Sequence, residues 1–325
     1  MRVLRLWLPA CKNLKNYKKM KVLVATEKPF AKAAVDGIRS IVEGAGHTLV
    51  LLEKYTGTDQ FYAAATDADA IIVRSDILTK EVIAVAKNLK IVVRAGAGYD
   101  NLDLPACSER GIVAMNTPGQ NSNAVAELAL GMMIYISRNC FAPGTGSELK
   151  GKSIGIHAYG NVGKLVAKLA LGFGMKVYAF DPFVKAEVIE KDGVTPVASI
   201  EDLYSKSNFV SLHIPATAET KKSVGYNLIS KLPKGGCLVN TARKEVINEE
   251  ELVKIFEERP DIKYITDIAA DNQAELNGKF GNRVFASPKK MGAETAEANI
   301  NAGLAAANQI VRFFATGDKT FQLNK

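Results

Sequence analysis

The amino-acid sequence predicts an α/β protein with two doubly wound, Rossmann-like domains built on parallel sheets. From Met20 onward, short β-branched runs alternate with segments whose apolar residues recur at helical spacing. The strand segments are apolar almost throughout, which is typical of strands buried on both faces of a parallel sheet. The chain has 325 residues, 47% of them hydrophobic, which is enough for two domains with ordinary globular cores.

Composition and charge argue against several other classes of protein. The net charge is +8, but seven basic residues and no acidic residue fall within residues 2–21, so the remainder of the chain is nearly neutral. We therefore expect no nucleic-acid-binding face. No apolar run reaches the roughly 18 residues that a membrane span requires. The four cysteines show no CxxC pair and no metal-ligand spacing, so we expect reduced thiols, no metal site and a cytoplasmic location.

Residues 1–19 form a basic extension, which we expect to be unstructured and to lie outside the folded domains. Its apolar segment is interrupted by Arg5 and is too short for the core of a secretory signal. A strand pattern begins directly after Met20, so the first folded element starts there.

The first alternating set of elements is predicted to contain five strands. Segments with helical spacing separate them, for example 30–43, which Gly44 ends. The predicted strands are 21–26, 48–52, 70–73, 90–93 and 112–115.

The second alternating set follows a long predicted helix at 123–139 and a turn-rich stretch at 142–147. Asn248 is predicted to cap a helix, because three glutamates follow it at the positive end of the helix dipole. A final helix is predicted at 294–316, before Gly317. The predicted strands of this set are 153–156, 176–180, 209–212, 237–240, 264–266 and 284–286.

A loop after the strand at 153–156 resembles the dinucleotide fingerprint GxGxxG, with Ala158 at the first glycine position. Gly160 would let the backbone approach a pyrophosphate, and Gly163 would let the following helix pack closely on the strand. The N–H groups at the start of that helix, including those of Asn161 and Val162, would then bind the phosphates.

The cofactor is predicted to be NAD. The second strand of this set ends at Asp181, 18 residues beyond Gly163. An acidic residue at this place binds the ribose hydroxyls of NAD and repels the additional phosphate of NADP. No arginine follows it that could accept that phosphate, because the next residues are Pro182 and Phe183.

Further segments resemble the D-2-hydroxyacid dehydrogenases, most closely the short D-3-phosphoglycerate dehydrogenases. The segments that carry this resemblance are 73–75, 94–103, 116–121, 239–243 and 292–295. The resemblance implies a discontinuous substrate domain at 20–118 and 300–325, with an NAD-binding domain inserted at 119–299. It also implies a homodimer formed through the helix at 123–139 and the arm that follows it, without a C-terminal regulatory domain.

The resemblance also implies roles for individual residues. Arg243 takes the place of the catalytic arginine, and its planar, permanently charged guanidinium suits capture of a carboxylate and polarisation of the adjacent carbonyl. The residues expected to bind substrate are Arg74, Ser75, Arg94, Gly96, Gly98 and Asn121. Those expected to line the cofactor are Ala97, Ala158, Gly160, Asn161, Val162, Gly163, Asp181, Ile214, Thr241, Ala242, Asp267 and Gly292.

The sequence departs from the family pattern at the acid/base residue. The family has a histidine shortly before the last long helix, and Lys290 stands at its place. The glutamate that accompanies this histidine is replaced by Asn272, next to Asp271. Because a lysine ammonium is protonated at neutral pH, it needs no carboxylate to raise its pKa. We therefore expect Lys290 to be the acid/base, and the three histidines to be structural or surface residues.

The function expected from these features is the NAD-dependent interconversion of 3-phosphoglycerate and 3-phosphohydroxypyruvate, the first step of phosphorylated serine biosynthesis. A dehydrogenase of another 2-hydroxy acid, such as glyoxylate or lactate, is the first alternative, and Arg74 with Ser75 decides between them. A non-catalytic NAD-binding regulator is the second alternative.

Overall fold

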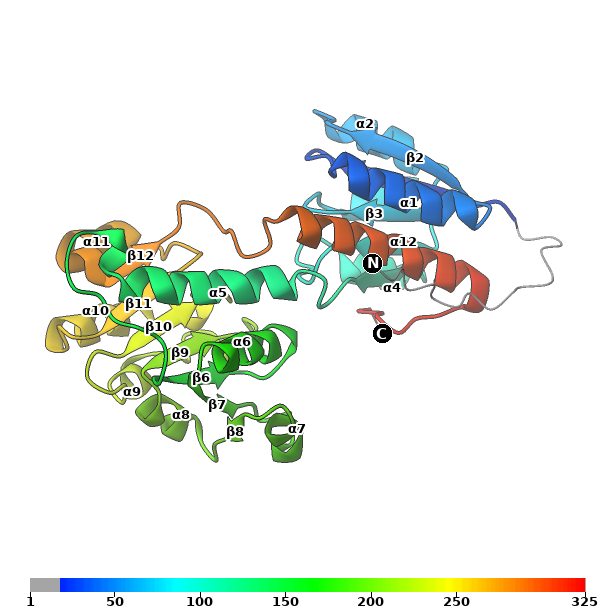
Figure 1. Ribbon diagram of the computed structural model, residues 1–325. Coiled ribbons are helices and arrows are strands. Elements are labelled where there is room, and N and C mark those ends of the chain that lie inside the picture. The colour runs from blue at the N-terminus through cyan, green and yellow to red at the C-terminus, as the bar shows by residue number, and fades with distance from the viewer. Residues whose placement is uncertain (1–17, 325) are drawn as a thin grey trace. The chain divides into compact units, whose positions relative to one another are not determined.

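The computed structural model describes residues 18–324, so most of the basic extension expected at 1–19 lies outside the described residues (Figure 1). The chain forms two compact units. Unit 1 extends up to Ala95 and contains Tyr99–Asn116 and the chain from Gly303 onward; unit 2 contains Gly96–Gly98 and Thr117–Ala302.

Unit 1 contains a five-stranded parallel sheet with the order β2-β1-β3-β4-β5. All five strands were predicted from the sequence, and their ends agree to within one residue. This order is that of the doubly wound, flavodoxin-like sheets. The strands are β1 (Lys21–Thr26), β2 (Thr48–Glu53), β3 (Ala70–Val73), β4 (Ile91–Arg94) and β5 (Val113–Asn116).

Helices cover both faces of this sheet. The α1 helix and the part of α12 in unit 1 pack together, because a Cβ added at Gly37 would lie 2.4 Å from Leu304 and one at Gly303 would lie 3.0 Å from Ile38. The other face buries a core against α2, α3 and α4. The helices are α1 (Lys32–Gly44), α2 (Thr58–Ala65), α3 (Lys80–Val85), α4 (Leu104–Glu109) and α12 (Ala296–Thr316).

Unit 2 contains a seven-stranded parallel sheet with the order β12-β11-β10-β9-β6-β7-β8. The strand order reverses between β6 and β9, which is the point where ligands bind in such sheets. The strands are β6 (Ser153–His157), β7 (Lys176–Phe180), β8 (Thr195–Pro196), β9 (Phe209–Leu212), β10 (Cys237–Asn240), β11 (Lys263–Thr266) and β12 (Val284–Ala286).

Two hydrophobic cores lie on opposite faces of this second sheet. One packs α5 (Ser122–Ser137), α6 (Asn161–Gly172) and α7 (Ala186–Lys191) against the strands. The other packs the remaining helices, which are α8 (Ile200–Lys206), α9 (Tyr226–Ile229), α10 (Glu249–Glu258) and α11 (Gln273–Phe280). Three short 3-10 helices complete the unit, namely η1 (Asn139–Phe141), η2 (Lys244–Val246) and η3 (Gly281–Arg283).

The structure differs from the predicted elements at the ends of some helices and in one strand; α1, for example, begins at Lys32 rather than at 30. The edge strand β8 was not predicted. The long helix α5 ends at Ser137 rather than at 139, because the next turn contains three residues with positive φ, at Asn139, Cys140 and Phe141. The last helix begins at Ala296, two residues later than expected.

The loop Gly96–Gly98 groups with unit 2, although the sequence placed it in the substrate domain. The Gly96 N–H donates to Thr117 Oγ1 at 2.6 Å, and the Thr117 N–H donates to the Gly96 carbonyl at 3.0 Å. These two hydrogen bonds attach the loop to the first residue of the main segment of unit 2. That segment begins at 117, two residues before the expected 119, and ends at 302, three residues after the expected 299.

Candidate active site

The loop between β6 and α6 has the geometry expected of a dinucleotide-binding turn. A Cβ added at Gly163 would lie 2.3 Å from the carbonyl oxygen of Ala158, so only glycine permits this approach of helix and strand. A Cβ added at Gly160 would meet no atom within 4 Å. The protein's own atoms therefore leave room for a side chain at Gly160. A phosphate group of a ligand that approaches this position would occupy the same space, and would therefore require glycine.

The N-terminus of α6 is suited to bind a phosphate. Gly160 is its N-cap residue and supplies no side-chain hydrogen bond, so the N–H groups of the first turn, from Asn161 to Gly163, are not capped by it. The Asn161 side chain lies beside Gly119, where an added Cβ would be 3.3 Å from its Nδ2. Ala158 has a φ of +80°, a left-handed conformation that normally favours glycine, so the methyl group at this position brings backbone strain.

Asp181 is held by two main-chain donors at the end of β7. The Tyr159 N–H donates to Oδ2 at 2.7 Å, and the Phe183 N–H donates to Oδ1 at 2.8 Å. An ionised carboxylate can accept further hydrogen bonds from its remaining lone pairs. It is therefore fixed in orientation and still able to accept bonds from two neighbouring hydroxyls.

Three buried polar atoms lie just beyond the carboxyl ends of β9, β10 and β11. His213 Nε2, Thr241 Oγ1 and Asp267 Oδ1 each lack a hydrogen-bond partner within residues 18–324. Buried polar atoms in native proteins are nearly always bonded, so each of these indicates a missing ligand or water molecule. Ile214 and Ala242, also expected at the cofactor, are buried next to His213 and Thr241 in sequence.

The charges of both predicted catalytic residues act on Asp267. This residue is fully buried, and its Oδ2 accepts a hydrogen bond from the Gly292 N–H at 2.7 Å. Burial raises the pKa of Asp267, and the charges of Lys290 and Arg243 act in the opposite direction. Arg243 is half-buried, with Nη1 donating to the Ala242 carbonyl at 2.9 Å, whereas Lys290 is exposed. Both cations therefore lie close enough to the carboxylate to influence its ionisation.

In unit 1, the residues expected to bind substrate lie at the carboxyl ends of β3 and β4. Arg94 Nε donates to the Arg74 carbonyl at 3.0 Å, and the Arg74 guanidinium lies 6.0 Å from the ring centroid of Phe30. Ser75 is exposed beside them. Two guanidinium groups on neighbouring strands and one hydroxyl form an arrangement suited to an anionic group.

The remaining substrate and cofactor residues of the glycine loop lie in unit 2. Gly96 is buried, and Ala97 and Gly98 are half-buried. Asn121 is the N-cap residue of α5, and its side chain makes no capping hydrogen bond. It is half-buried, so its amide remains able to bond a ligand.

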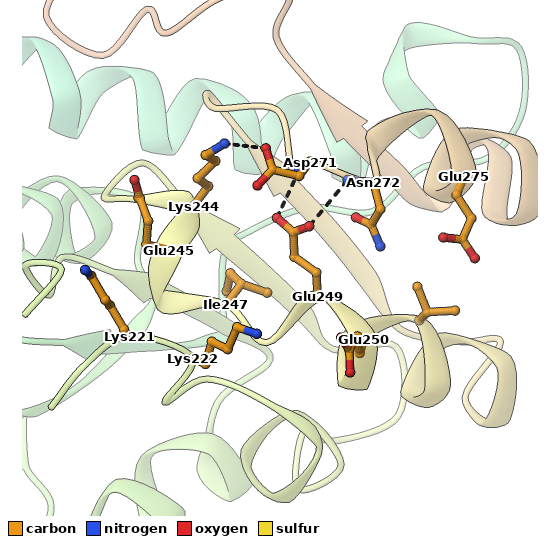
Figure 2. Close-up of a pocket in the computed structure, with 11 residues that line it drawn as sticks. Lys221, Lys222, Lys244, Glu245, Ile247, Glu249, Glu250, Asp271, Asn272 and Glu275 are labelled. Atoms are coloured by element: carbon orange, nitrogen blue, oxygen red, sulfur yellow. Dashed lines mark hydrogen bonds and ion pairs between the residues drawn. The ribbon is translucent and has the colours of Figure 1, made fainter. Parts of the chain in front are cut away.

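Asp271 and Asn272 line a separate pocket of about 810 Å³ in unit 2 (Figure 2). The Asp271 carboxylate forms an ion pair with Lys244, and this raises the pKa of Lys244. The Glu249 carboxylate accepts from the N–H groups of Asp271 and Asn272 at 3.0 and 3.3 Å. This pocket was not predicted from the sequence, because its charged residues come from separate loops. Its lining is Lys221, Lys222, Lys244, Glu245, Ile247, Glu249, Glu250, Val253, Asp271, Asn272 and Glu275.

Two of the three histidines form a half-buried pair at the point where the strand order reverses. The His213 N–H donates to the His157 carbonyl at 2.9 Å, and His157 Nδ1 lies 3.3 Å from the Tyr204 hydroxyl. Burial lowers the pKa of His157 to about 4 and that of His213 to about 3. His47 lies in unit 1, where its ring packs edge-on against Phe314.

Within residues 18–324, no group of three or more His, Cys, Asp and Glu side chains is arranged to hold a metal ion. None of the helices in that range combines the length and apolar character needed to cross a bilayer.

Comparison with known proteins identifies the family. The sequence model of the "D-isomer specific 2-hydroxyacid dehydrogenase, NAD binding domain" matches residues 111–288. A crystal structure of NAD⁺-bound 3-phosphoglycerate dehydrogenase from Entamoeba histolytica is 51% identical, with a TM-score of 0.84 over 95% of this chain and 99% of that one.

Two curated relatives differ in the substrate that their names state. D-3-phosphoglycerate dehydrogenase of Methanocaldococcus jannaschii is 34% identical over 75% of this chain, which spans only 49% of that protein's length. Hydroxypyruvate reductase of Thermotoga maritima is 33% identical over 81% of this chain and 90% of its own length. The chain thus spans about half the length of the curated phosphoglycerate dehydrogenase, and most of the reductase. It belongs to the D-isomer specific 2-hydroxyacid dehydrogenases, and NAD is the cofactor of the domain at 111–288.

Proposed function

We propose that the chain interconverts 3-phosphoglycerate and 3-phosphohydroxypyruvate with NAD. The observation that carries this proposal is the group of buried polar atoms at the ends of β9, β10 and β11 that lack partners within the described chain, at a carboxylate on which the charges of Arg243 and Lys290 both act. The residues of unit 2 fit NAD: a Cβ at Gly160 would occupy open space, and Asp181 has free acceptor capacity. Gly160–Gly163 would hold the pyrophosphate, and Asp181 the ribose hydroxyls.

The protein's own residues then bind the substrate and move the proton. When bound at this site, NADH would supply the hydride that the 2-keto carbon accepts. Arg243 binds the substrate carboxylate and polarises the keto oxygen through its planar fork of N–H donors. Lys290 donates a proton from Nζ to that oxygen. In the oxidative direction Lys290 must first lose this proton, and an ordinary lysine is only about 0.04% neutral at pH 7, so oxidation should have an alkaline optimum.

Substrate choice depends on unit 1. Arg74 and Ser75 are proposed to bind the phosphate, and the two guanidinium groups at the ends of β3 and β4 support an anionic ligand there. The Entamoeba and Methanocaldococcus relatives favour this assignment by their names. The Thermotoga reductase supports the alternative, a 2-hydroxy acid without phosphate. A non-catalytic NAD-binding regulator is a further alternative, which the action of two cationic side chains on Asp267 disfavours.

A homodimer in the cytoplasm is part of the proposal. Leu128, Ile134 and Tyr135 of α5 pack against the core but are only partly buried, and Phe141 in the following arm is 70% exposed. An apolar helix face of this kind is suited to bury itself against a second copy.

The test is NADH oxidation with a panel of 2-keto acids, including phosphohydroxypyruvate, hydroxypyruvate, glyoxylate and pyruvate. We expect the highest kcat/KM with phosphohydroxypyruvate. Lys290→Met should lower kcat roughly 100-fold, the usual share of general acid–base catalysis. Activity with none of these acids would contradict the enzymatic assignment. Near-parental turnover of Lys290→Met would exclude Lys290 from the mechanism, whereas the neighbouring Lys289→Met is the matched control and should stay active.

A further inference from the structure

Lys290 lies on a segment without regular secondary structure, between β12 and α12. Its ammonium sits on a flexible four-carbon stem, yet proton transfer needs donor and acceptor within hydrogen-bonding reach. The backbone that carries this side chain must therefore be held in place by other contacts. Such contacts are found on both sides of Lys290 in the sequence.

Ser287 holds the segment on the N-terminal side. The residue is only 4% exposed, and its Oγ lies 2.7 Å from the Lys289 carbonyl and 2.9 Å from the Asp267 carbonyl. A serine hydroxyl has one proton, so the two carbonyls share one donor. The Ser287 N–H also donates to the Thr266 carbonyl at 3.1 Å. Ser287 therefore joins the lysine-bearing segment to the end of β11.

Asp267 holds the segment on the C-terminal side. Its Oδ2 accepts from the Gly292 N–H at 2.7 Å, and a Cβ at Gly292 would lie 2.9 Å from that same oxygen. Asp267 itself is anchored, because its N–H donates to the Asn240 carbonyl at 3.2 Å. The fully buried Asp267 thus fixes both ends of the segment. Its carbonyl holds Ser287 at one end, and its carboxylate holds Gly292 at the other.

We propose that Ser287 is a positioning residue for Lys290. Its hydroxyl fixes the carbonyl that precedes Lys290, and so sets the place from which the ammonium reaches the keto oxygen. The inference rests on the acid/base role proposed for Lys290. The Ser287 hydroxyl faces two main-chain carbonyls and acts through the backbone. Its removal leaves both carbonyls without this donor and allows the segment to adopt other conformations.

The test compares Ser287→Ala with Ser287→Thr, which keeps the hydroxyl, using the full chain and the most active keto acid of the panel. We expect Ser287→Ala to lower kcat for reduction about tenfold, because small misplacements of a catalytic group have effects of this size or larger. The KM for NADH should stay unchanged, and the alkaline limb of the pH profile of kcat should move. Ser287→Thr should stay close to the parent protein.

The matched control is Ser205→Ala. Ser205 Oγ also donates to a main-chain carbonyl, that of Asp202 at 3.2 Å, on the exposed helix α8. This variant should leave kcat and its pH profile unchanged. If Ser287→Ala does not fold, Ser287→Cys replaces it, since a thiol is similar in shape and a weak donor. A lower melting temperature with unaltered kcat and pH profile would show a merely structural role and overturn the proposal.

A double-mutant cycle with Lys290→Met separates this inference from the proposed function. If Ser287 acts through Lys290, the double variant should have the kcat of Lys290→Met alone. A further tenfold loss in that background would overturn the positioning role while leaving Lys290 as acid/base. Equal losses in Ser287→Thr and Ser287→Ala would also overturn it. Near-parental activity of Lys290→Met would instead contradict the proposed function itself.

Discussion

The carboxyl ends of the two parallel sheets differ in how their buried polar groups are satisfied. In unit 2, Thr241 and Asp267 each keep a buried side-chain oxygen without a partner within the described residues. In unit 1, the buried Asp76 carboxylate accepts from the Glu27 N–H and from the Tyr55 hydroxyl, both at 2.7 Å. Glu53 Oε1, at the end of β2 in unit 1, also lacks a partner within the described residues, so the contrast is between Asp76, next to Arg74, and the pair Thr241 and Asp267.

This difference separates the roles of the two units. An unsatisfied buried polar group costs about 1–3 kcal/mol, and a ligand that restores its hydrogen bonds recovers that cost on binding. The edge of unit 2 is therefore suited to a cofactor that enters a prepared, buried site. At the edge of unit 1, Arg74 instead belongs to a backbone segment that the hydrogen bonds of Asp76 hold in place. Substitutions in unit 2 should affect the cofactor and the chemistry, and those in unit 1 the substrate alone.

The largest expected effect is that of Arg243→Gln, because it removes the charge proposed to polarise the keto group. We expect kcat/KM for the keto acid to fall by about 10³-fold, as when a preorganised charge-stabilising donor is lost. Binding of NADH, followed by fluorescence, should be nearly unchanged. Arg312→Gln, an exposed arginine on α12, serves as the control and should keep full activity. A loss of less than tenfold in Arg243→Gln would place the chemistry elsewhere.

Arg74→Ala tests the assignment of unit 1 to the substrate. Loss of a charged hydrogen bond to phosphate should lower kcat/KM for phosphohydroxypyruvate about 10- to 100-fold. Hydroxypyruvate, which lacks the phosphate, should be reduced as before. Arg39→Ala removes an exposed guanidinium paired with Glu43 on the same unit and is the control. Unchanged activity of Arg74→Ala with the phosphorylated acid would show that the phosphate assignment is wrong.

Asp181→Asn should alter the cofactor and leave the substrate unaffected. We expect the KM for NAD to rise about tenfold, since one ionic acceptor for the ribose hydroxyls is lost. Discrimination against NADP should decrease, because the repelling charge is gone. Asp192→Asn is a close control, as Asp192 accepts from the hydroxyl of the same Tyr159 whose N–H binds Asp181. Equal effects of the two substitutions would argue against a specific contact of Asp181 with NAD.

The smallest expected effect is on stability, and it also distinguishes the two units. The pKa values of His157 and His213 are lowered in the folded protein to about 4 and about 3, from an ordinary value of 6.5. Between pH 6.5 and 4 the unfolded chain therefore binds more protons than the folded one. The free energy of unfolding should fall with falling pH, by at most about 1.4 kcal/mol per pH unit for each histidine.

Urea unfolding at pH 7 and pH 5 measures this loss. In His157→Leu the decrease between the two pH values should be smaller than in the parent protein. An equal decrease in both proteins would show that His157 is not the group that titrates. Both of these histidines lie in unit 2, whereas unit 1 contains only His47, whose pKa is also lowered by burial. Acid should therefore destabilise unit 2, which binds the cofactor, more than unit 1.

Most of the fold was predictable because its strands are short runs of β-branched residues. All eleven predicted strands are present, since burial on both faces leaves an apolar run that composition reveals. The strand β8 was not predictable, because it is a two-residue edge strand containing Pro196. The grouping of the loop Gly96–Gly98 with unit 2 has no local signal in the sequence, because its hydrogen bonds to Thr117 join residues 21 positions apart.

The residues of the candidate site could be predicted where a local sequence motif contains them. Contacts between side chains of distant loops could not be predicted. Gly163 could be identified from spacing alone, but the positive φ of Ala158 could not, since alanine normally favours helix. The ion pair of Asp271 with Lys244 joins residues 27 positions apart, and no pattern in either loop indicates it. The Ser287 hydroxyl bonds the Asp267 carbonyl, 20 positions away in the sequence, and no pattern in either segment indicates this contact.

The return of the chain to unit 1 has a consequence for biosynthesis. The Asn324 side chain accepts from the Ala114 N–H and donates to the Ile112 carbonyl, across 210 and 212 positions of sequence. On a ribosome, the first sheet therefore lacks its final contacts until residue 324 has emerged. The main segment of unit 2 is contiguous and can reach its native state during translation. Synthesis thus favours an order in which the nucleotide-binding unit matures first, while unit 1 waits for the segment that begins at Gly303.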